Sequence, residues 1–241
     1  MKISVVTPTI RKEMLDIVHR CLSRQTCMDF EWLIVGPKEL NYSWDKFIEE
    51  PPKREGDFYN LNKAWNAAFK QAKGELIVSI VDGLWFPPDT LEKLWYHYEN
   101  NPMSCIGGVG HQYDQMENGK PEHRVWFDPR MKEDLQFYEV PPNDFELCVA
   151  SLPLKGIKDV GGMDEKWDQY AALSEKELCY RMSTIGYMFN LDQSIEYRAI
   201  SHPRLHGQEE WDKHYFAGCD YFRECLKEID EGKRTKLDYL S

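Results

Sequence analysis

The chain has 241 residues, of which 42% are hydrophobic and 13% aromatic, and its formal net charge is −11. This length and composition predict a folded globular protein with one main core and exclude a disordered chain. The acidic balance argues against a broad nucleic-acid footprint or an anchor on an acidic membrane, because both require clustered Lys and Arg.

The cysteines and apolar runs indicate the cellular setting. Seven scattered cysteines, an odd number without a Cys-x-x-Cys pair, form a poor disulfide framework, so we expect reduced thiols. The apolar run at residues 3–6 is too short for a signal sequence, and no later run approaches the ~18 residues of a membrane-spanning helix. The sequence therefore predicts a soluble, cytoplasmic protein.

In the first half of the chain, short apolar runs alternate with segments of helical periodicity. Apolar residues recur at i, i+3, i+4 and i+7 within residues 14–22 and 61–69, as in amphipathic helices, and Gly74 is expected to end the second one. Asp89 and Glu92 resemble a capping box, so a third helix is predicted from there. The apolar runs are typical of strands covered on both faces, and they occupy residues 3–6, 32–35, 76–81 and 105–109.

Strands that alternate with helices imply right-handed βαβ units and a doubly wound α/β sheet. In such sheets ligands bind beyond the carboxyl ends of the strands. The run that ends at Val81 is followed at once by Asp82, which puts a carboxylate at that edge. Because Asp-Gly is also an ordinary turn signal, Asp82 with Gly83 has a purely structural alternative.

The second half is less regular. A polar and aromatic region covers residues 111–146, and a loop follows at residues 155–167. A helix is expected from about residue 175 to residue 185, where Gly186 stops it, and the last segment predicts a long amphipathic helix over residues 209–229. With no repeat or linker visible, one domain is the economical interpretation.

Three segments, in order, resemble the family 2 glycosyltransferases with the GT-A fold, over roughly the first 205 residues. "ISVVTPTIRKEMLDIVHRCLSRQTCMDFEWLIVG" is similar to the nucleotide-binding opening of that family. "LNKAWNAAFKQAKGELIVSIVDGLWFPPDTLEKL" resembles the helix and strand that lead into the Asp-x-Asp motif. "GIKDVGGMDEKWDQYAALSEKELCYRMSTIGY" looks like the acceptor loop and the catalytic-base helix.

The resemblance implies a GT-A-like, mostly parallel sheet flanked by helices in a single domain. Residues 1–207 would form the glycosyltransferase domain, with its nucleotide-binding part at about 1–110 and its acceptor part at about 111–207. Residues 208–241 would be a helical extension packed on the same domain.

The sequence also departs from the family pattern at three places. Where the family has Asp-x-Asp, this chain has Val81-Asp82-Gly83, so only the middle position is acidic. Gly36-Pro37 replaces the usual acidic residue after the second strand, and Ala64-Trp65-Asn66 replaces Ala-Arg-Asn. The first change bears on metal binding, and the other two bear on the contacts to the nucleotide.

A divalent cation, Mn²⁺ or Mg²⁺, is the cofactor that the resemblance implies, because such an ion stabilises charge on a departing diphosphate and prefers carboxylate ligands. Asp82 is the metal-side candidate. The family places a His after the last core strand, so His206 and His202 of "SHPRLHG" are further candidate ligands. The alternative for these two is a surface loop with solvated imidazoles, and the proline between them disfavours a helical zinc site.

Glu175 of "SEKEL" is the candidate catalytic base, because it matches the position of the family's catalytic Asp, and Glu177 matches the second acid. A carboxylate at a helix N-terminus stays ionised and can accept a proton. Its alternative is a helix-capping role. Residues that leave the first strand can bracket a base or ribose, and cations can offset diphosphate charge. The nucleotide-binding candidates are Thr7, Pro8, Thr9, Arg11, Lys63, Asn66 and Asp82.

Two aromatic segments are candidates for the acceptor side. Trp167, in "GGMDEKW", could stack on a sugar or belong to the core. The segment "RVWFDPR", residues 124–130, is cationic and aromatic and could line an acceptor cleft.

The resemblance implies an inverting, metal-assisted glycosyltransferase. The donor would be a nucleoside-diphosphate sugar, with a UDP-sugar favoured, and the hydroxyl acceptor is not identified by the sequence. One alternative is a catalytically inactive nucleotide-sugar or glycan-binding domain of the same fold. A nucleotidyltransferase ranks third, because it needs a Gly-rich phosphate loop near the first strand and "TPTIRKE" contains no glycine.

Overall fold

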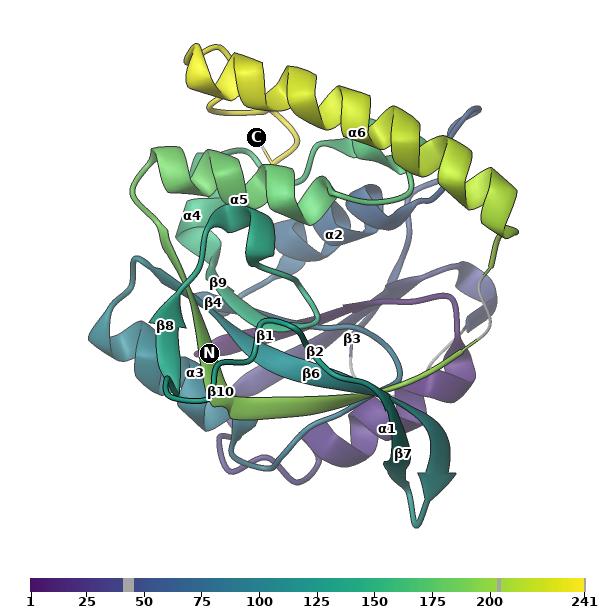
Figure 1. The fold of residues 1–241 in the computed structure, drawn as a ribbon, viewed down its shortest axis with the longest axis vertical. Helices are drawn as coiled ribbons and strands as arrows, with labels where there is room; N and C mark the ends of the chain where they lie inside the picture. The colour runs from purple at the N-terminus through teal and green to yellow at the C-terminus, as the bar shows by residue number, and fades with distance from the viewer. Residues whose placement is uncertain (41–45, 203–204, 241) are drawn as a thin grey trace.

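The computed structural model describes residues 1–40, 46–202 and 205–240. Its centre is a mixed β-sheet with the strand order β3-β2-β1-β4-β9-β6-β10-β5, in which β7 pairs with β6 and β8 pairs with β10 (Figure 1). The strands are β1 (Ile3–Pro8), β2 (Phe30–Gly36), β3 (Lys46–Glu49), β4 (Leu76–Ile80), β5 (Leu84–Trp85), β6 (Ser104–Glu117), β7 (Lys120–Trp126), β8 (Phe137–Glu139), β9 (Val149–Pro153) and β10 (Met188–Ile200).

Helices cover both faces of the sheet. Helices α2, α4 and α5 pack on one face, α1 and α3 pack on the other, and α6 lies outside α5 (Figure 1). The α-helices are α1 (Lys12–Leu22), α2 (Leu61–Gln71), α3 (Thr90–Asn100), α4 (Leu154–Asp159), α5 (Ser174–Thr184) and α6 (Gln208–Asp230), and the 3₁₀ turns are η1 (Lys38–Leu40), η2 (Pro142–Asp144) and η3 (Glu165–Gln169).

The apolar runs of the sequence form the central strands, as predicted. Every residue of β1 and β4 is buried, and alternate side chains supply the two cores. On one face, Val6 and Ile77 pack against α2; on the other, Val5 and Val78 pack against α1. The α/β fold class is therefore confirmed, although the sheet is mixed, because β9 runs antiparallel to both β4 and β6.

Several local expectations need correction. Asp89 is the N-cap residue of α3 but makes no side-chain capping bond, and its carboxylate pairs with Lys93 at 2.8 Å instead. Helix α2 ends at Gln71, before Gly74. Gly74 is needed for another reason: a Cβ there would lie 2.4 Å from the backbone nitrogen of Ser4. The expected loop at residues 155–167 is largely α4 and η3, and the irregular region after residue 110 contains the β6–β7 hairpin.

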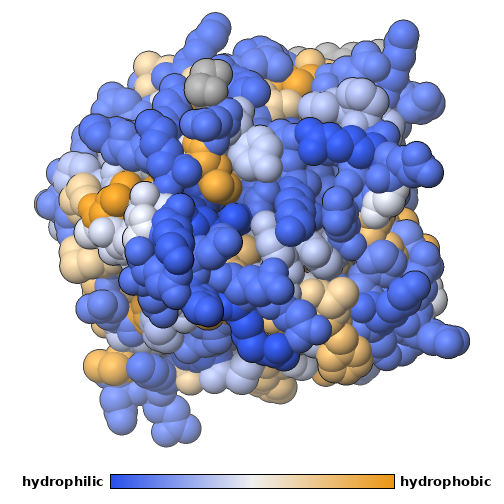
Figure 2. Space-filling view, turned by 90° about the horizontal axis from the view of Figure 1, so that it is seen from above, coloured by the Kyte–Doolittle hydropathy of each residue, from blue (hydrophilic) through white to orange (hydrophobic). Residues whose placement is uncertain are grey.

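The C-terminal helix α6 packs on the domain through a small aromatic cluster. Tyr221 and Cys225 of α6 bury Trp167 of η3, whose ring centroid lies 4.9 Å from that of Tyr221. All seven cysteines are free thiols. Within the described ranges, no helix is long and apolar enough to span a bilayer. The face on the α6 side is mostly hydrophilic, with small, separate hydrophobic patches (Figure 2).

Candidate active site at the carboxyl edge of the sheet

The carboxyl ends of three strands, β1, β4 and β10, lie at one edge of the sheet. Strand β4 is parallel to β1, and β10 is parallel to β6. Because β9 is antiparallel to both β4 and β6, those two strands point the same way, and β9 begins where they end. Side chains that follow β1, β4 and β10, or precede β9, are therefore brought to one edge.

Asp82 lies at this edge, immediately after β4, as predicted. Its side chain is only 9% exposed. Thr9 Oγ1, which follows β1, donates a hydrogen bond to Asp82 Oδ2 at 2.5 Å. Arg11 Nη1 lies 3.5 Å from each of the two carboxylate oxygens. The amide of Arg11 donates to Thr9 Oγ1 at 2.9 Å, so the three residues form one closed unit between β1 and β4.

Gly83 completes the turn after Asp82 in a conformation that suits glycine. Its φ is +71°, in the left-handed region, and a Cβ there would lie 3.1 Å from Ile200 Cγ2. Its amide donates to Met14 O at 3.4 Å, and its carbonyl accepts from Ile200 N at 3.1 Å. The position of the family's last acidic residue is thus fixed between α1 and β10.

We expect Gly83→Asp to lower the free energy of unfolding by about 1–3 kcal/mol, because it adds backbone strain and crowds Ile200. Gly56→Asp is the matched control: Gly56 has φ +86° but no neighbour within 4 Å of its Cβ position, so only the backbone cost of about 1 kcal/mol applies. Urea unfolding of both variants measures the difference. An equal loss in the two variants would show that Ile200 does not constrain this turn.

Glu175, the predicted base, lies in the first turn of α5 and is half-buried. The residue before α5, Leu173, has φ +75°, which turns the chain sharply into the helix. Burial raises the pKa of Glu175, although its own backbone amide and Ser174 act in the opposite direction, and the charge of Glu146 raises it further. A carboxylate with a raised pKa is a better proton acceptor than an exposed one.

Cys148 lies beside the residue that precedes Asp82. The carbonyl of Cys148, just before β9, accepts from the amide of Val81, the residue before Asp82. Burial raises the pKa of the Cys148 thiol to about 12, and Glu146 and Glu175 are among the charges that act on it. Lys176, the neighbour of Glu175, donates to the Asn143 carbonyl at 2.5 Å, so the start of α5 packs beside η2, on the segment that leads into β9.

Besides Arg130, which belongs to the predicted segment at residues 124–130, this edge contains polar groups that the sequence did not single out. Tyr197 of β10 is buried, and burial, with Cys148 nearby, raises the pKa of its hydroxyl well above the ordinary value. Arg130 Nη2 lies 3.4 Å from a Glu146 carboxylate oxygen. Their signal in the sequence is weak, because only the antiparallel direction of β9 brings residues 146–148 to the carboxyl edge.

The segment "RVWFDPR" divides into an anchored and an exposed part. Asp128 is buried, accepts from the Gly110 amide at 3.1 Å and pairs with Arg130. The Arg124 guanidinium lies 3.6 Å from the ring centroid of Phe127, which is 60% exposed. The exposed aromatic part remains a predicted acceptor surface.

Several nucleotide-binding candidates are used inside the fold. The Thr7 hydroxyl accepts from Trp32 Nε1 at 2.9 Å, and Pro8 is a buried residue of β1. Lys63 is 2% exposed and paired with the equally buried Asp57. Asn66 is bonded to the Met163 amide and carbonyl, both at 2.9 Å. Lys63 and Asn66 therefore lie inside the fold instead of lining an open diphosphate pocket, because α2 turns their side chains onto neighbouring loops.

Trp167 is 1% exposed, so it belongs to the core and is not available to stack on a sugar. The glycines before it are also covered, because Leu237 and Leu240 of the C-terminal segment pack on Gly161 and Gly162. The acceptor-side wall that the sequence predicts at this turn is therefore closed from one side by the end of the chain.

The candidate metal ligands are not brought together. His206 packs on Phe58, with ring centroids 4.0 Å apart, and its Nδ1 lies 3.3 Å from Glu210. His202 is exposed. Within residues 1–40, 46–202 and 205–240, no group of three or more His, Cys, Asp or Glu side chains is arranged to hold a metal ion. The donor set around Asp82 is one carboxylate with a hydroxyl and a guanidinium, which does not fit a divalent cation.

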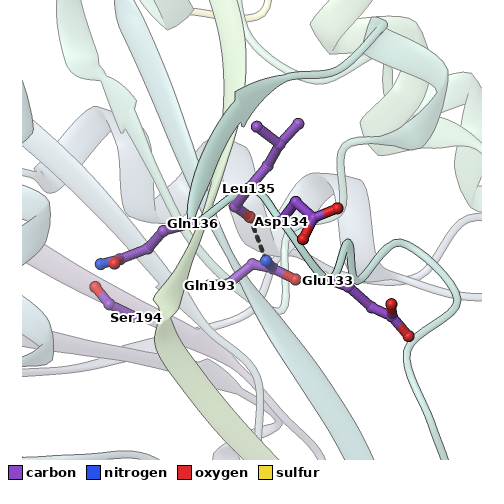
Figure 3. Close-up of a pocket in the computed structure, with 6 residues that line it drawn as sticks. All are labelled: Glu133, Asp134, Leu135, Gln136, Gln193 and Ser194. Atoms are coloured by element: carbon purple, nitrogen blue, oxygen red, sulfur yellow. Dashed lines mark hydrogen bonds between the residues drawn. The ribbon is translucent and has the colours of Figure 1, made fainter.

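An open hollow of about 490 Å³ lies away from this edge, beside β8 and the β10 bulge (Figure 3). The Gln193 amide donates to backbone carbonyls there and closes one wall. Its lining residues are Glu133, Asp134, Leu135, Gln136, Gln193 and Ser194. With two acids and no cation in the lining, it does not match a diphosphate.

The comparisons with known proteins agree with this geometry. Residues 53–152 match the family model described as glycosyl transferase family 2. The similarity to that family therefore covers less than half of the chain. The match begins in the loop before α2 and ends in β9, so it includes Asp82 and the start of β9 but not Glu175.

Two solved structures show the same GT-A fold at low identity. The first, Staphylococcus aureus TarS 1-349 in complex with UDP, has a TM-score of 0.57 and 15% identity, over 84% of this chain and 61% of that one. The second, GalNAc-T7 with UDP, GalNAc and Mn²⁺, has a TM-score of 0.63 and 13% identity, over 84% of this chain and 44% of that one. The chain thus spans less than two thirds of either protein. Among curated proteins, none matches the chain.

Proposed function

We propose that this protein transfers a sugar from a nucleoside-diphosphate donor to a hydroxyl acceptor with inversion at the anomeric carbon. Such a single displacement needs a base on the acceptor hydroxyl and compensation of charge on the leaving diphosphate. Glu175 is the base in this proposal, and the Thr9–Arg11–Asp82 unit is at the leaving-group side.

The observation that carries the proposal is the meeting of these two groups at one edge. Asp82 follows β4, and the Cys148 carbonyl accepts from the amide of the residue before Asp82. The start of α5, which carries Glu175, packs on the segment that leads into β9 through the bond from Lys176 to the Asn143 carbonyl. Ligands of α/β sheets bind beyond such edges. The family match supports a glycosyl donor over other ligands of this fold class.

A UDP-sugar is the favoured donor. The support comes from two relatives in fold, both crystallised with UDP. Thr9 and Pro8 at the end of β1 are the residues that would lie beside the base and ribose, since β1 ends at the same edge as β4.

An inactive nucleotide-sugar or glycan-binding domain is the second candidate function. It is favoured by Val81 and Gly83, which leave a single acid where the family has two. Such a domain would bind a nucleotide sugar without transferring or hydrolysing the sugar.

The test is turnover of nucleotide sugars. The purified protein is incubated with UDP-, GDP-, CDP- and TDP-sugars and with small glycan acceptors, and release of the diphosphate is measured. We expect release with one nucleotide, a transfer product whose anomeric configuration by NMR is opposite to that of the donor, and loss of both in Glu175→Gln. Retained configuration would contradict the inverting mechanism, and binding without release would favour the inactive domain.

A further inference from the structure

The Asp82 carboxylate is bonded to Thr9 and faces Arg11. These contacts determine which charged groups are available to a bound diphosphate. We propose that Arg11, held in place by Asp82, binds the donor diphosphate directly and that diphosphate binding does not require a metal ion. The inference rests on the proposed function, because it concerns the same donor site. In it Arg11 is the binding residue and Asp82 and Thr9 are positioning residues.

The hydrogen bonds of Asp82 come first. Its Oδ2 accepts from the Thr9 hydroxyl at 2.5 Å, and both of its oxygens face Arg11 Nη1 at 3.5 Å. An ionised carboxylate only accepts hydrogen bonds, and here both oxygens face a cation. A divalent cation at Asp82 would meet the guanidinium as a like charge, and Arg11 would have to leave first.

The local geometry also disfavours a second carboxylate. The position after Asp82 is Gly83, with φ +71° and with Ile200 and Met14 3.1 Å and 3.4 Å from a Cβ built there. Of the two predicted histidines, His206 is packed against Phe58, and His202 is exposed. Divalent cations of this kind take several oxygen ligands, and this turn supplies one residue.

Arg11 has the capacity and the position to bind a diphosphate. A guanidinium carries five N–H donors in a planar fork that matches phosphate oxygens. In the part of the chain that the structure describes, the hydrogen bonds of the Arg11 guanidinium come from Nη1 alone, both to Asp82. Its side chain is 19% exposed, so it is largely packed and still reaches solvent at the edge.

The surroundings of Arg11 add to this. Arg11 is the N-cap residue of α1, and its amide is fixed by Thr9 Oγ1 at 2.9 Å. The N-terminus of an eleven-residue helix presents partial positive charge, which favours an anion beside it. Because the Arg11–Asp82 pair is neutral as a whole, direct hydrogen bonds from Arg11 and the helix end have to provide what a metal ion would otherwise supply.

The experiment is a calorimetric titration of the purified protein with UDP, GDP, CDP and TDP, each in EDTA and each in Mn²⁺. The diphosphate that binds is then compared with its own nucleoside, for the wild type and for Arg11→Ala, Arg11→Lys and Lys12→Ala. Lys12 is the matched control, because it is the neighbouring cation and is exposed. Thermal unfolding of each variant establishes that it is folded.

We expect the diphosphate to bind with the same affinity, within about threefold, in EDTA and in Mn²⁺. Arg11→Ala should weaken diphosphate binding about 10- to 100-fold, the usual effect of losing hydrogen bonds to a charged group, and leave the nucleoside unchanged. Arg11→Lys keeps the charge without the planar fork and should lose less, while Lys12→Ala should lose almost nothing.

Three results would overturn the inference and leave the proposed function intact. The first is diphosphate binding that Mn²⁺ strengthens more than tenfold, and the second is an Arg11→Ala variant that binds diphosphate as the wild type does. The third is an equal loss for nucleoside and diphosphate, because Arg11 would then be structural. Absence of binding by all four diphosphates in both buffers would overturn the proposed function together with the inference.

Discussion

Glu175→Gln is expected to reduce the turnover number for sugar transfer by about 10²- to 10⁴-fold, the usual contribution of a positioned base. Glutamine has nearly the same shape but cannot accept the proton of the acceptor hydroxyl. Binding of the nucleotide should be unchanged, because Glu175 acts on the acceptor. The measurement is the turnover number with saturating donor, alongside the dissociation constant of the diphosphate.

The pH dependence of the same reaction provides an independent check. Burial raises the pKa of Glu175, so the active carboxylate is lost at a higher pH than for an exposed Glu. Activity should therefore fall as the pH decreases through this raised pKa. A rate that stays constant down to the pKa of an ordinary Glu would contradict the role of Glu175.

Stability separates this effect from damage to the fold. A raised pKa in the folded state means that ionised Glu175 costs folding free energy at neutral pH. Glu175→Gln removes that cost, so this variant should be at least as stable as the wild type at pH 7. Loss of activity together with lower stability would point to the helix-capping alternative. Glu177→Gln, two residues along α5, is the comparison for a purely structural acid, because Glu177 is fully buried.

The sequence predicted the elements of the site well wherever local patterns decide the structure. The run that ends at Val81 forms β4, and Asp82 follows it at the carboxyl edge, because a continuous apolar run specifies a strand covered on both faces. The helix at Glu175 and the long C-terminal helix were also predicted from local patterns, and the structure confirms both. Local patterns do not show which side of each element faces a ligand.

Lys63, Asn66 and Trp167 show why the rest could not be predicted. Each has a side chain that suits a sugar nucleotide, yet each is at most 2% exposed. Lys63 is neutralised by Asp57, and Asn66 is bonded to residue 163, 97 positions away in the chain. Such pairings depend on how loops fold back on α2, which no periodicity in the sequence reports. The antiparallel course of β9, which brings Cys148 to the edge, is equally non-local.

A buried ionic network fixes α5, the helix that carries the proposed base Glu175. Glu177 and Arg181 are both 0% exposed, and Arg181 Nε lies 2.7 Å from Glu177 Oε1. The same guanidinium donates to the carbonyls of Val160 and Gly162 at 2.6 Å and 2.7 Å. Arg234 of the C-terminal segment donates to Glu177 Oε1 at 2.8 Å. The first turn of α5 is thus joined to the turn at residues 160–164 and to the end of the chain.

We expect Arg181→Met to lower the free energy of unfolding by about 3–5 kcal/mol, because it leaves Glu177 with one cation in place of two and removes the hydrogen bonds to the carbonyls of Val160 and Gly162. Met keeps most of the side-chain length, so the loss reports on the charge and the hydrogen bonds. Arg223→Met is the matched control. Its pair with Asp220 is exposed on α6, with side-chain exposures of 72% and 70%, and exposed substitutions of this kind change stability by no more than about 0.5 kcal/mol.

Urea unfolding at pH 7 measures both variants. A loss below about 1 kcal/mol for Arg181→Met would mean that Arg234 alone can neutralise Glu177. The consequence reaches the site itself, because Glu177 lies two residues after Glu175 on α5. If the network sets the position of the base, the residual folded Arg181→Met protein should also show a reduced turnover number with unchanged diphosphate affinity, since Arg11 and Asp82 lie on other elements of the edge.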